Sequence, residues 1–230
     1  MATYVLIHGA WHGRWCWRDV EDELRARGQD AISMDLPVDR PGATFADYAE
    51  VVLDAVPADA DDLVVVGHSL GSMVVPLVAG ARPVVASVSL CGPVPNPEGP
   101  LWDGALRTKG PGSAGAVRAD DRGLLRWHDE QAAIDCFYAD CEPQVARWAY
   151  SQLRPQDLGL LAAPYPLDAV PPGPRMAIVG VDDAMLDIDE ARESCRARLG
   201  ADPTELPGGH SPFLARPGAL ADALVEIVQS

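Results

Sequence analysis

The chain has 230 residues, 48% hydrophobic and 23% charged, a composition typical of one globular domain over residues 1–230 rather than a disordered or membrane-spanning chain. Eighteen basic residues against 34 acidic ones give a formal net charge of −16, which opposes binding to nucleic acid or to an anionic membrane. Five cysteines without a C-x-x-C pair are typical of free thiols in a reducing compartment. Because the N-terminus shows no basic segment with a cleavage site, we expect a cytoplasmic protein.

Short apolar runs alternate with amphipathic segments along the chain. The runs that predict buried strands are residues 3–7, 31–34, 63–66, 84–90, 176–179 and 203–206. The predicted helices are residues 17–27, 45–56, 69–79, 190–199 and 217–228. This alternation predicts an α/β fold, with a mainly parallel sheet and helices on both of its faces.

Two residues refine the predicted helices. Thr44 is expected to cap the helix at residues 45–56, with Asp47 three positions later completing a capping box. Pro76 lies inside the predicted helix at residues 69–79. We expect it to kink that helix, because proline has no N–H to donate and its ring crowds the preceding turn.

The alternation stops after residue 90. Residues 92–115 are rich in proline and glycine, and helices are predicted at 129–138 and 143–153 before the next strand. Residues 91–175 are therefore a predicted insertion, expected to form a helical cap over the carboxyl edge of the sheet, where open α/β sheets bind ligands. Residues 110–115 match the dinucleotide pattern G-x-G-x-x-G but follow no strand and contain a proline, so we predict a loop and no cofactor.

The pentapeptide at residues 67–71, Gly-His-Ser-Leu-Gly, follows a predicted strand and precedes a predicted helix. This is the setting of a nucleophile elbow, in which glycines allow close approach of the backbone around a strained serine, here Ser69. The elbow architecture orders an acid and then a histidine after the serine. Among the five histidines, His210 alone follows both the predicted insertion and a candidate acid. We therefore predict that Ser69 is the nucleophile and His210 its base.

The acid is expected just after the strand at residues 176–179, where Asp182 and Asp183 stand side by side. We favour Asp183 as the partner of the imidazole. Asp182 is then a turn residue, and Asp187 begins the next helix. The sequence alone does not separate these three carboxylates.

An acyl-transfer site also needs N–H donors for the developing oxyanion. The backbone N–H of Leu70, the residue after the nucleophile, is one expected donor, and that of Ala10, in the loop after the first strand, is the other. Trp11 is next to this loop and is a candidate substrate-binding residue. His8 and His12 flank a glycine turn rather than a helix, so no metal site is predicted.

Four segments together resemble one known family: residues 8–17, the elbow at 67–71, the acid loop at 179–184 and residues 208–210. The chain resembles the α/β-hydrolase superfamily, and within it the small-esterase branch of plant methyl-ester esterases and hydroxynitrile lyases. The resemblance implies a cofactor-free Ser-His-Asp hydrolase with a helical cap. The lyases of this branch place a threonine where this chain has Gly9 and a lysine where it has Ser211. Ester hydrolysis therefore fits better than lyase chemistry.

The sequence thus predicts a carboxylic-ester hydrolase that acts on a small to medium, uncharged or apolar ester-like molecule through an acyl-enzyme. Alternatives are hydrolysis of a lactone, thioester or amide, hydroxynitrile-lyase-like chemistry, and a non-catalytic ligand-binding module on the same fold. The sequence identifies neither the substrate nor the oligomeric state.

Overall fold

The computed structural model describes residues 1–96 and 115–229. Within them, six strands form one sheet in the order β2-β1-β3-β4-β7-β8, and every neighbouring pair is parallel. The strands are β1 (Thr3–Ile7), β2 (Asp30–Ser33), β3 (Leu63–His68), β4 (Ala86–Leu90), β7 (Arg175–Gly180) and β8 (Thr204–Leu206). The predicted mainly parallel α/β fold is confirmed. The pattern at 110–115 lies, apart from Gly115, outside the described residues.

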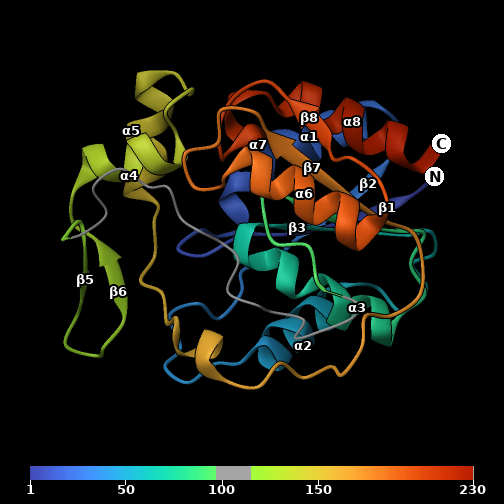
Figure 1. The fold of residues 1–230 in the computed structure, drawn as a ribbon, viewed down its shortest axis with the longest axis horizontal. Helices are drawn as coiled ribbons and strands as arrows, with labels where there is room; N and C mark the ends of the chain where they lie inside the picture. Colours follow the sequence, from blue (N-terminus) through green and yellow to red (C-terminus); the bar gives the residue numbers. More distant parts are fainter. Residues whose placement is uncertain (97–114, 230) are drawn as a thin grey trace.

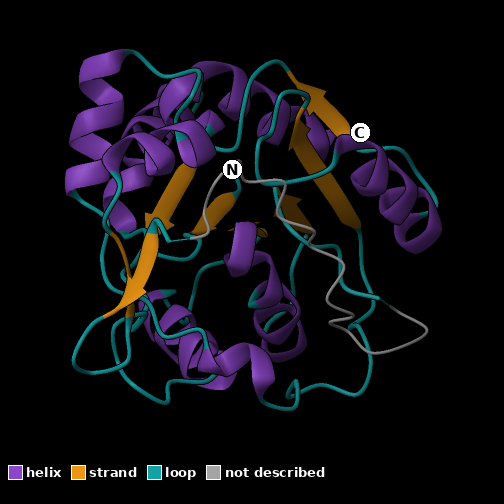
Figure 2. Ribbon diagram, turned by 60° about the vertical axis from the view of Figure 1, so that its left-hand side comes forward, coloured by secondary structure: helices purple, strands orange, loops and turns teal. Residues whose placement is uncertain are grey.

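The sheet is covered on both faces, and its central strands β1 and β3 are buried at every position. In β1, Tyr4 and Leu6 join the hydrophobic cluster beneath α1 (Arg18–Ala26) and α8 (Pro217–Gln229). Val5 and Ile7 join the cluster beneath α2 (Phe45–Ala55) and α3 (Val75–Ala81). Figures 1 and 2 show these two helical layers on opposite sides of the sheet. A further helix, α6 (Ile188–Leu199), packs its Cys195 against Ala177 of β7.

The segment after β3 differs from its prediction. A 3-10 helix, η2 (Ser69–Met73), follows the strand, and the α-helix α3 begins separately at Val75. Pro76 lies in the first turn of α3, so it kinks no helix; its missing N–H would have no partner there in any case. The capping box of Thr44 and Asp47 at the start of α2 is confirmed.

Between the adjacent strands β4 and β7, the chain leaves the sheet and returns to it. Residues 91–96 and 115–174 of this excursion are described, and residues 115–174 are called the cap segment below. It contains the antiparallel hairpin β5 (Val117–Ala119) and β6 (Leu125–Trp127), then α4 (Glu130–Phe137), α5 (Pro143–Ser151) and η3 (Gly159–Ala162). The hairpin was not predicted, because three-residue strands carry no periodic signal. Figure 1 shows the hairpin, α4 and α5 together at one side of the sheet. That 91–175 is an insertion within a single domain stays a prediction.

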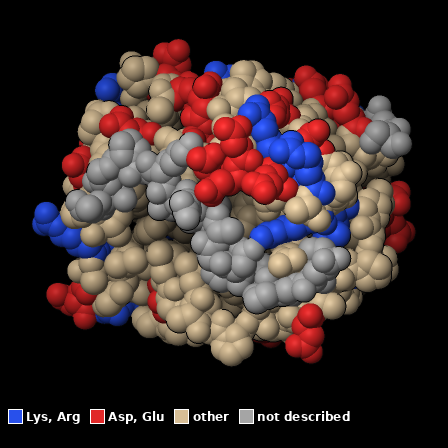
Figure 3. Space-filling view, in the orientation of Figure 1, with Lys and Arg blue, Asp and Glu red and all other residues tan. Residues whose placement is uncertain are grey.

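Acidic side chains are spread over the face of the molecule seen in Figure 3 rather than gathered at one point. Two arginines of α6 pair with acidic residues: Arg192 with Asp189 and Glu205, and Arg196 with Asp202. In the part of the chain that the structure describes, no helix combines the length and the apolar character needed to cross a bilayer.

Candidate active site

Ser69 stands at the tip of β3 in a strained backbone conformation, with φ of 49°. Left-handed φ is costly for a residue with a side chain and persists only where the surroundings enforce it. Those surroundings are tight: a Cβ built on Gly67 would lie 2.4 Å from the carbonyl oxygen of Gly71, and one built on Gly71 would lie 2.6 Å from that of His8. The two glycines therefore allow the turn and bring the loop after β1 against it.

His210 and Asp183 form a buried pair at the carboxyl edge of the sheet. Nδ1 of His210 lies 2.8 and 3.0 Å from the two carboxylate oxygens of Asp183, and the side chains are 2% and 1% exposed. The Asp183 carboxylate also accepts the N–H groups of Met185 at 2.7 Å and Leu186 at 3.0 Å. These bonds fix the carboxylate, so the imidazole carries its proton on Nδ1. Nε2 is left as the basic nitrogen.

The other two candidate acids lie apart from the imidazole. Asp182 is exposed, and its backbone N–H donates to the carbonyl of Gly208. Asp187 caps α6 by accepting the N–H groups of Asp189 and Glu190. Asp183 is thus the carboxylate that the structure pairs with His210.

The base is held beside the elbow by His68, the residue before Ser69. Nε2–H of His68 donates to the carbonyl of His210 at 2.9 Å, and the two rings lie 4.8 Å apart. Nε2 of His210 is buried, with no hydrogen-bond partner among the described residues, and no bond joins it to the Ser69 hydroxyl there. Ser69, His210 and Asp183 therefore share one edge of the sheet, with the His–Asp bond made and the Ser–His bond not.

The loop after β1 contacts the elbow. A Cβ built on Gly9 would lie 2.9 Å from the Cβ of Ser69. The loop turns at Ala10 and Trp11, where Trp11 has φ of 60° and the N–H of His12 donates to the carbonyl of Gly9 at 3.4 Å. Across residues 1–96 and 115–229, the N–H groups of Ala10 and Leu70 make no backbone hydrogen bond outside the regular bonds of helices and strands. Both are available to a ligand at Ser69.

We expect the substitution Gly9→Ala to lower the activity of Ser69 at least about tenfold, because the added methyl group would push the serine or the loop from its position. The measurement is the rate constant for covalent labelling of Ser69 by a fluorophosphonate. Gly80→Ala is the matched control, because a Cβ there meets only Pro171, at an ordinary 3.4 Å. Equal labelling of the two variants would contradict the prediction.

Three further histidines around the site are buried and neutral. Burial lowers the pKa of His8 to about 4 and that of His12 to about 3, and it lowers the pKa of His68 well below its usual value. Nδ1–H of His8 donates to the carbonyl of Gly9 at 2.9 Å, and its Nε2 accepts the N–H of Leu36 at 2.9 Å. No sequence pattern predicts these bonds, which hold the loop after β1.

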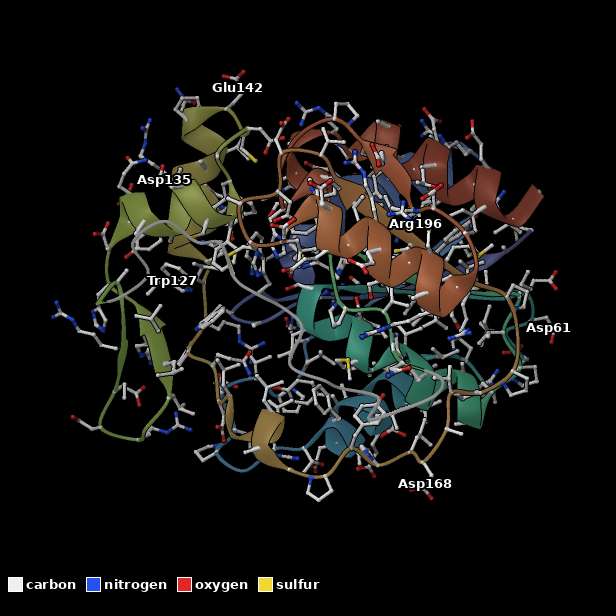
Figure 4. All side chains as sticks on the ribbon, in the orientation of Figure 1. Asp61, Trp127, Asp135, Glu142, Asp168 and Arg196 are labelled. Atoms are coloured by element: carbon white, nitrogen blue, oxygen red, sulfur yellow. The ribbon has the colours of Figure 1, made fainter. Side chains whose placement is uncertain are left out.

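Aromatic side chains flank the loop and the base. The ring of Trp11 lies 5.7 Å from that of Trp127 and 6.0 Å from that of Phe137, which in turn lies 5.8 Å from His210. Figure 4 shows Trp127 in the cap segment. The indole N–H of Trp11 donates to the carbonyl of Leu125 at 3.0 Å, so this side chain joins the loop to the cap segment.

Sequence reasoning missed Cys91, which follows β4 with φ of 44° and is fully buried. Burial, followed by the charge of Asp183, raises the pKa of its thiol well above the usual value. The thiol therefore stays protonated. All five cysteines are free, and the described residues contain no group of His, Cys, Asp and Glu suited to a metal ion.

Comparison with known proteins places these features among hydrolases. The sequence profile described as "Alpha/beta hydrolase family" matches residues 4–223. The chain is 39% identical to Esterase PIR7B of Oryza sativa subsp. japonica over 105 residues. This aligned region covers 40% of this chain and 39% of the esterase. The chain is 37% identical over 87 residues to a carbendazim hydrolyzing esterase of Nocardioides sp. (strain SG-4G), covering 34% and 36%. The chain thus matches well under half the length of these relatives.

The whole chain superposes on the crystal structure of a pyrethroid hydrolase from Sphingobium faniae JZ-2 with a TM-score of 0.77. The superposition covers 100% of this chain and 98% of that one, at 22% sequence identity. At this identity the likeness concerns the fold.

Proposed function

Because the chain belongs to the alpha/beta hydrolase family, we propose that it is a serine hydrolase that cleaves carboxylic esters through an acyl-enzyme. One observation carries the proposal. The buried His210–Asp183 pair lies beside a serine held in a strained conformation at the end of a strand. Such a constellation supplies a nucleophile, a base and an orienting carboxylate.

In the proposed mechanism, the Ser69 oxygen attacks the ester carbonyl while Nε2 of His210 takes the hydroxyl proton. Asp183 keeps the other nitrogen protonated and stabilises the imidazolium. The N–H groups of Ala10 and Leu70 bind the oxyanion. The C–O bond to the alcohol then breaks as His210 returns the proton to the leaving oxygen. Water attacks the acyl-enzyme by the same route and releases the acid.

The proposed substrate is a small, uncharged ester. Its support is the aromatic wall of Trp11, Trp127 and Phe137 next to His210. The arginines nearby are already paired, Arg154 with Asp39 and Arg216 with Asp140, so they offer little to a charged substrate. Lactone, thioester and amide hydrolysis use the same machinery and are distinguished by assay.

Hydroxynitrile-lyase-like chemistry is disfavoured by the space at Gly9. A threonine at this position would place its Cβ 2.9 Å from that of Ser69, so the serine or the loop would have to move. Ser211, where the lyases of this branch carry a lysine, is fully buried and uncharged. A module that only binds its ligand would not need the hydrogen-bonded His210–Asp183 pair.

The proposal is tested by fluorophosphonate labelling, together with hydrolysis of p-nitrophenyl esters of graded acyl length. We expect labelling on Ser69 alone, located by peptide mass spectrometry. Labelling of another residue, or no labelling of the folded protein, would favour the alternative that the protein binds a ligand without catalysis. We propose a cytoplasmic location as well, for which the five free thiols are the support.

The assignment of the acid predicts unequal effects of two neighbouring substitutions. Asp183→Asn should lower kcat about 10³-fold or more, because the amide removes the charge that stabilises the imidazolium and favours the wrong tautomer. Asp182→Asn, at an exposed side chain, should change kcat less than about twofold. The measurement is steady-state hydrolysis of one p-nitrophenyl ester by both variants, and a larger loss at Asp182 would reverse the assignment.

A further inference from the structure

The end of α4 contacts both halves of the proposed catalytic machinery. We propose that residues 137–140, called the cap turn below, clamp the oxyanion loop and the loop of the general base in register, with Tyr138 and Asp140 as positioning residues. The inference rests on the proposed function and extends it, because it gives the cap segment a role in catalysis besides covering the substrate.

Tyr138 acts on the oxyanion loop through His12. Its hydroxyl, fully buried, lies 2.8 Å from Nε2 of His12, and Nδ1 of His12 lies 2.7 Å from the carbonyl oxygen of Ala10. A carbonyl only accepts, so Nδ1 carries the proton, and Nε2 accepts from the tyrosine. The low pKa of His12, about 3, keeps this tautomer neutral.

His12 holds two successive peptide groups of the loop. Its ring fixes the carbonyl of Ala10, and its backbone N–H donates to the carbonyl of Gly9. The Gly9 carbonyl and the Ala10 N–H belong to the same planar peptide group, so fixing one directs the other. The other end of the next peptide is held too, because the N–H of Trp11 donates to Gln156 at 3.2 Å. These hydrogen bonds therefore keep the Ala10 N–H directed at the oxyanion position, while Trp11 stays at positive φ.

Asp140 acts on the loop that carries the base. Its carboxylate accepts the N–H of Gly209, the residue before His210, at 3.1 Å and pairs with Arg216. A Cβ on Gly208 would lie 2.2 Å from atoms of both Asp140 and Arg216, so this backbone is packed directly on the ion pair. The loop of His210 is thus fixed from the cap segment.

Phe137 joins the two contacts. Its ring lies 5.4 Å from that of His12 and 5.8 Å from that of His210. Three of four consecutive residues therefore touch the two loops, and the side chain between them, Ala139, is exposed. A displacement of α4 would move the oxyanion donor and the base together.

Two substitutions separate this role from plain stability. Tyr138→Phe removes one hydroxyl from the cap turn, and Tyr150→Phe, at a cap tyrosine whose hydroxyl makes a longer 3.4 Å contact with the Trp127 carbonyl, is its control. Asp140→Asn removes the charge beside Gly209, and Asp135→Asn is its control. Asp135 is exposed, on the outer side of α4 in Figure 4.

The substrates are the methyl and p-nitrophenyl esters of one acid. p-Nitrophenoxide leaves without a proton, whereas methoxide needs the proton of His210. Tyr138→Phe should lower kcat about tenfold on both esters, because the oxyanion forms with either leaving group. Asp140→Asn should lower kcat several times more on the methyl ester than on the p-nitrophenyl ester, with KM nearly unchanged in both variants.

Rates are normalised to the serine titrated by fluorophosphonate, so unfolded protein does not count. Unchanged kcat in both variants, losses confined to KM, or equal losses in the two controls would overturn the clamp while wild-type hydrolysis stands. A folded wild-type protein that hydrolyses neither ester and takes up no fluorophosphonate would contradict the proposed function, and the clamp with it.

Discussion

Replacement of Ser69 by alanine is expected to lower kcat for ester hydrolysis by about 10³-fold or more. The reaction loses the oxygen that forms the acyl-enzyme, while water and the N–H groups of Ala10 and Leu70 retain a small residual rate. The fold should persist, because alanine removes only one heavy atom from the side chain. Alanine also tolerates the φ of 49° about as well as serine.

The measurement combines steady-state kinetics with urea unfolding. Ser151→Ala is the matched control, because Ser151 is exposed in α5 and its hydroxyl bonds only within the cap segment, to Trp148 and Gln152. We expect the control to keep full activity. Hydrolysis by Ser69→Ala at a rate near that of the wild type would show that another group attacks the ester.

Acid should unfold the protein far above the pH at which its carboxylates are protonated. His8, His12 and His68 are neutral in the fold, with pKa values of about 4, about 3 and well below the usual 6.5. In the unfolded chain each recovers an ordinary pKa near 6.5. Between these values the unfolded state binds more protons than the native state, so the free energy of unfolding falls as the pH falls.

The size of this effect follows from the number of protons. Each histidine contributes about 1.4 kcal/mol per pH unit, so three together contribute up to about 4 kcal/mol per unit just below pH 6. This is a large part of the 5 to 15 kcal/mol, roughly, that stabilises an ordinary domain. The stability is fully present above the unfolded pKa and is lost progressively as the pH drops towards 4.

Urea unfolding at pH 7.5, 6.5, 5.5 and 5.0 measures the slope. The test variant combines His12→Asn with Tyr138→Phe. The asparagine keeps a donor for the Ala10 carbonyl, and the phenylalanine removes the hydroxyl that would lose its partner. We expect this variant to reduce the pH dependence of the free energy of unfolding by about one proton. His128→Asn, at an exposed side chain, should leave it unchanged. A wild-type free energy that is flat from pH 7.5 to 5.0 would show that these histidines are protonated in the fold.

The sequence predicts the sheet well, because the sheet depends on local patterns, and the chain order proposed for the site follows from a local pattern too. Buried parallel strands are continuous apolar runs, and the elbow pattern itself orders Ser69, the acid and His210. The choice of Asp183 over Asp182 depends on which carboxylate the turn after β7 directs inward. The two residues are adjacent in a turn, where no periodic pattern distinguishes a buried position from an exposed one. In the structure, the Asp183 carboxylate accepts the N–H groups of Met185 and Leu186 and lies 2.8 Å from Nδ1 of His210, which supports the prediction.

Other features are non-local and could not be predicted. Tyr138 meets His12 across 126 residues of chain, and Asp140 meets Gly209 across 69. Pro76 misled the prediction because a proline within a helical pattern indicates a kink, whereas a break at Val74 makes it a favourable first-turn residue. The charge of Asp183 acts on the thiol of Cys91 because β4 and β7 are neighbours in the sheet.

The excursion between β4 and β7 has a consequence for engineering. Because the chain leaves and re-enters the sheet at adjacent strands, a foreign cap could be grafted there without disturbing strand order. The hydroxyl of Tyr138 and the carboxylate of Asp140 limit that modularity. Consider a chimera whose new cap lacks a tyrosine and an acidic residue two positions later at the helix end that replaces the end of α4. We expect it to bind its new ligand but to hydrolyse it slowly.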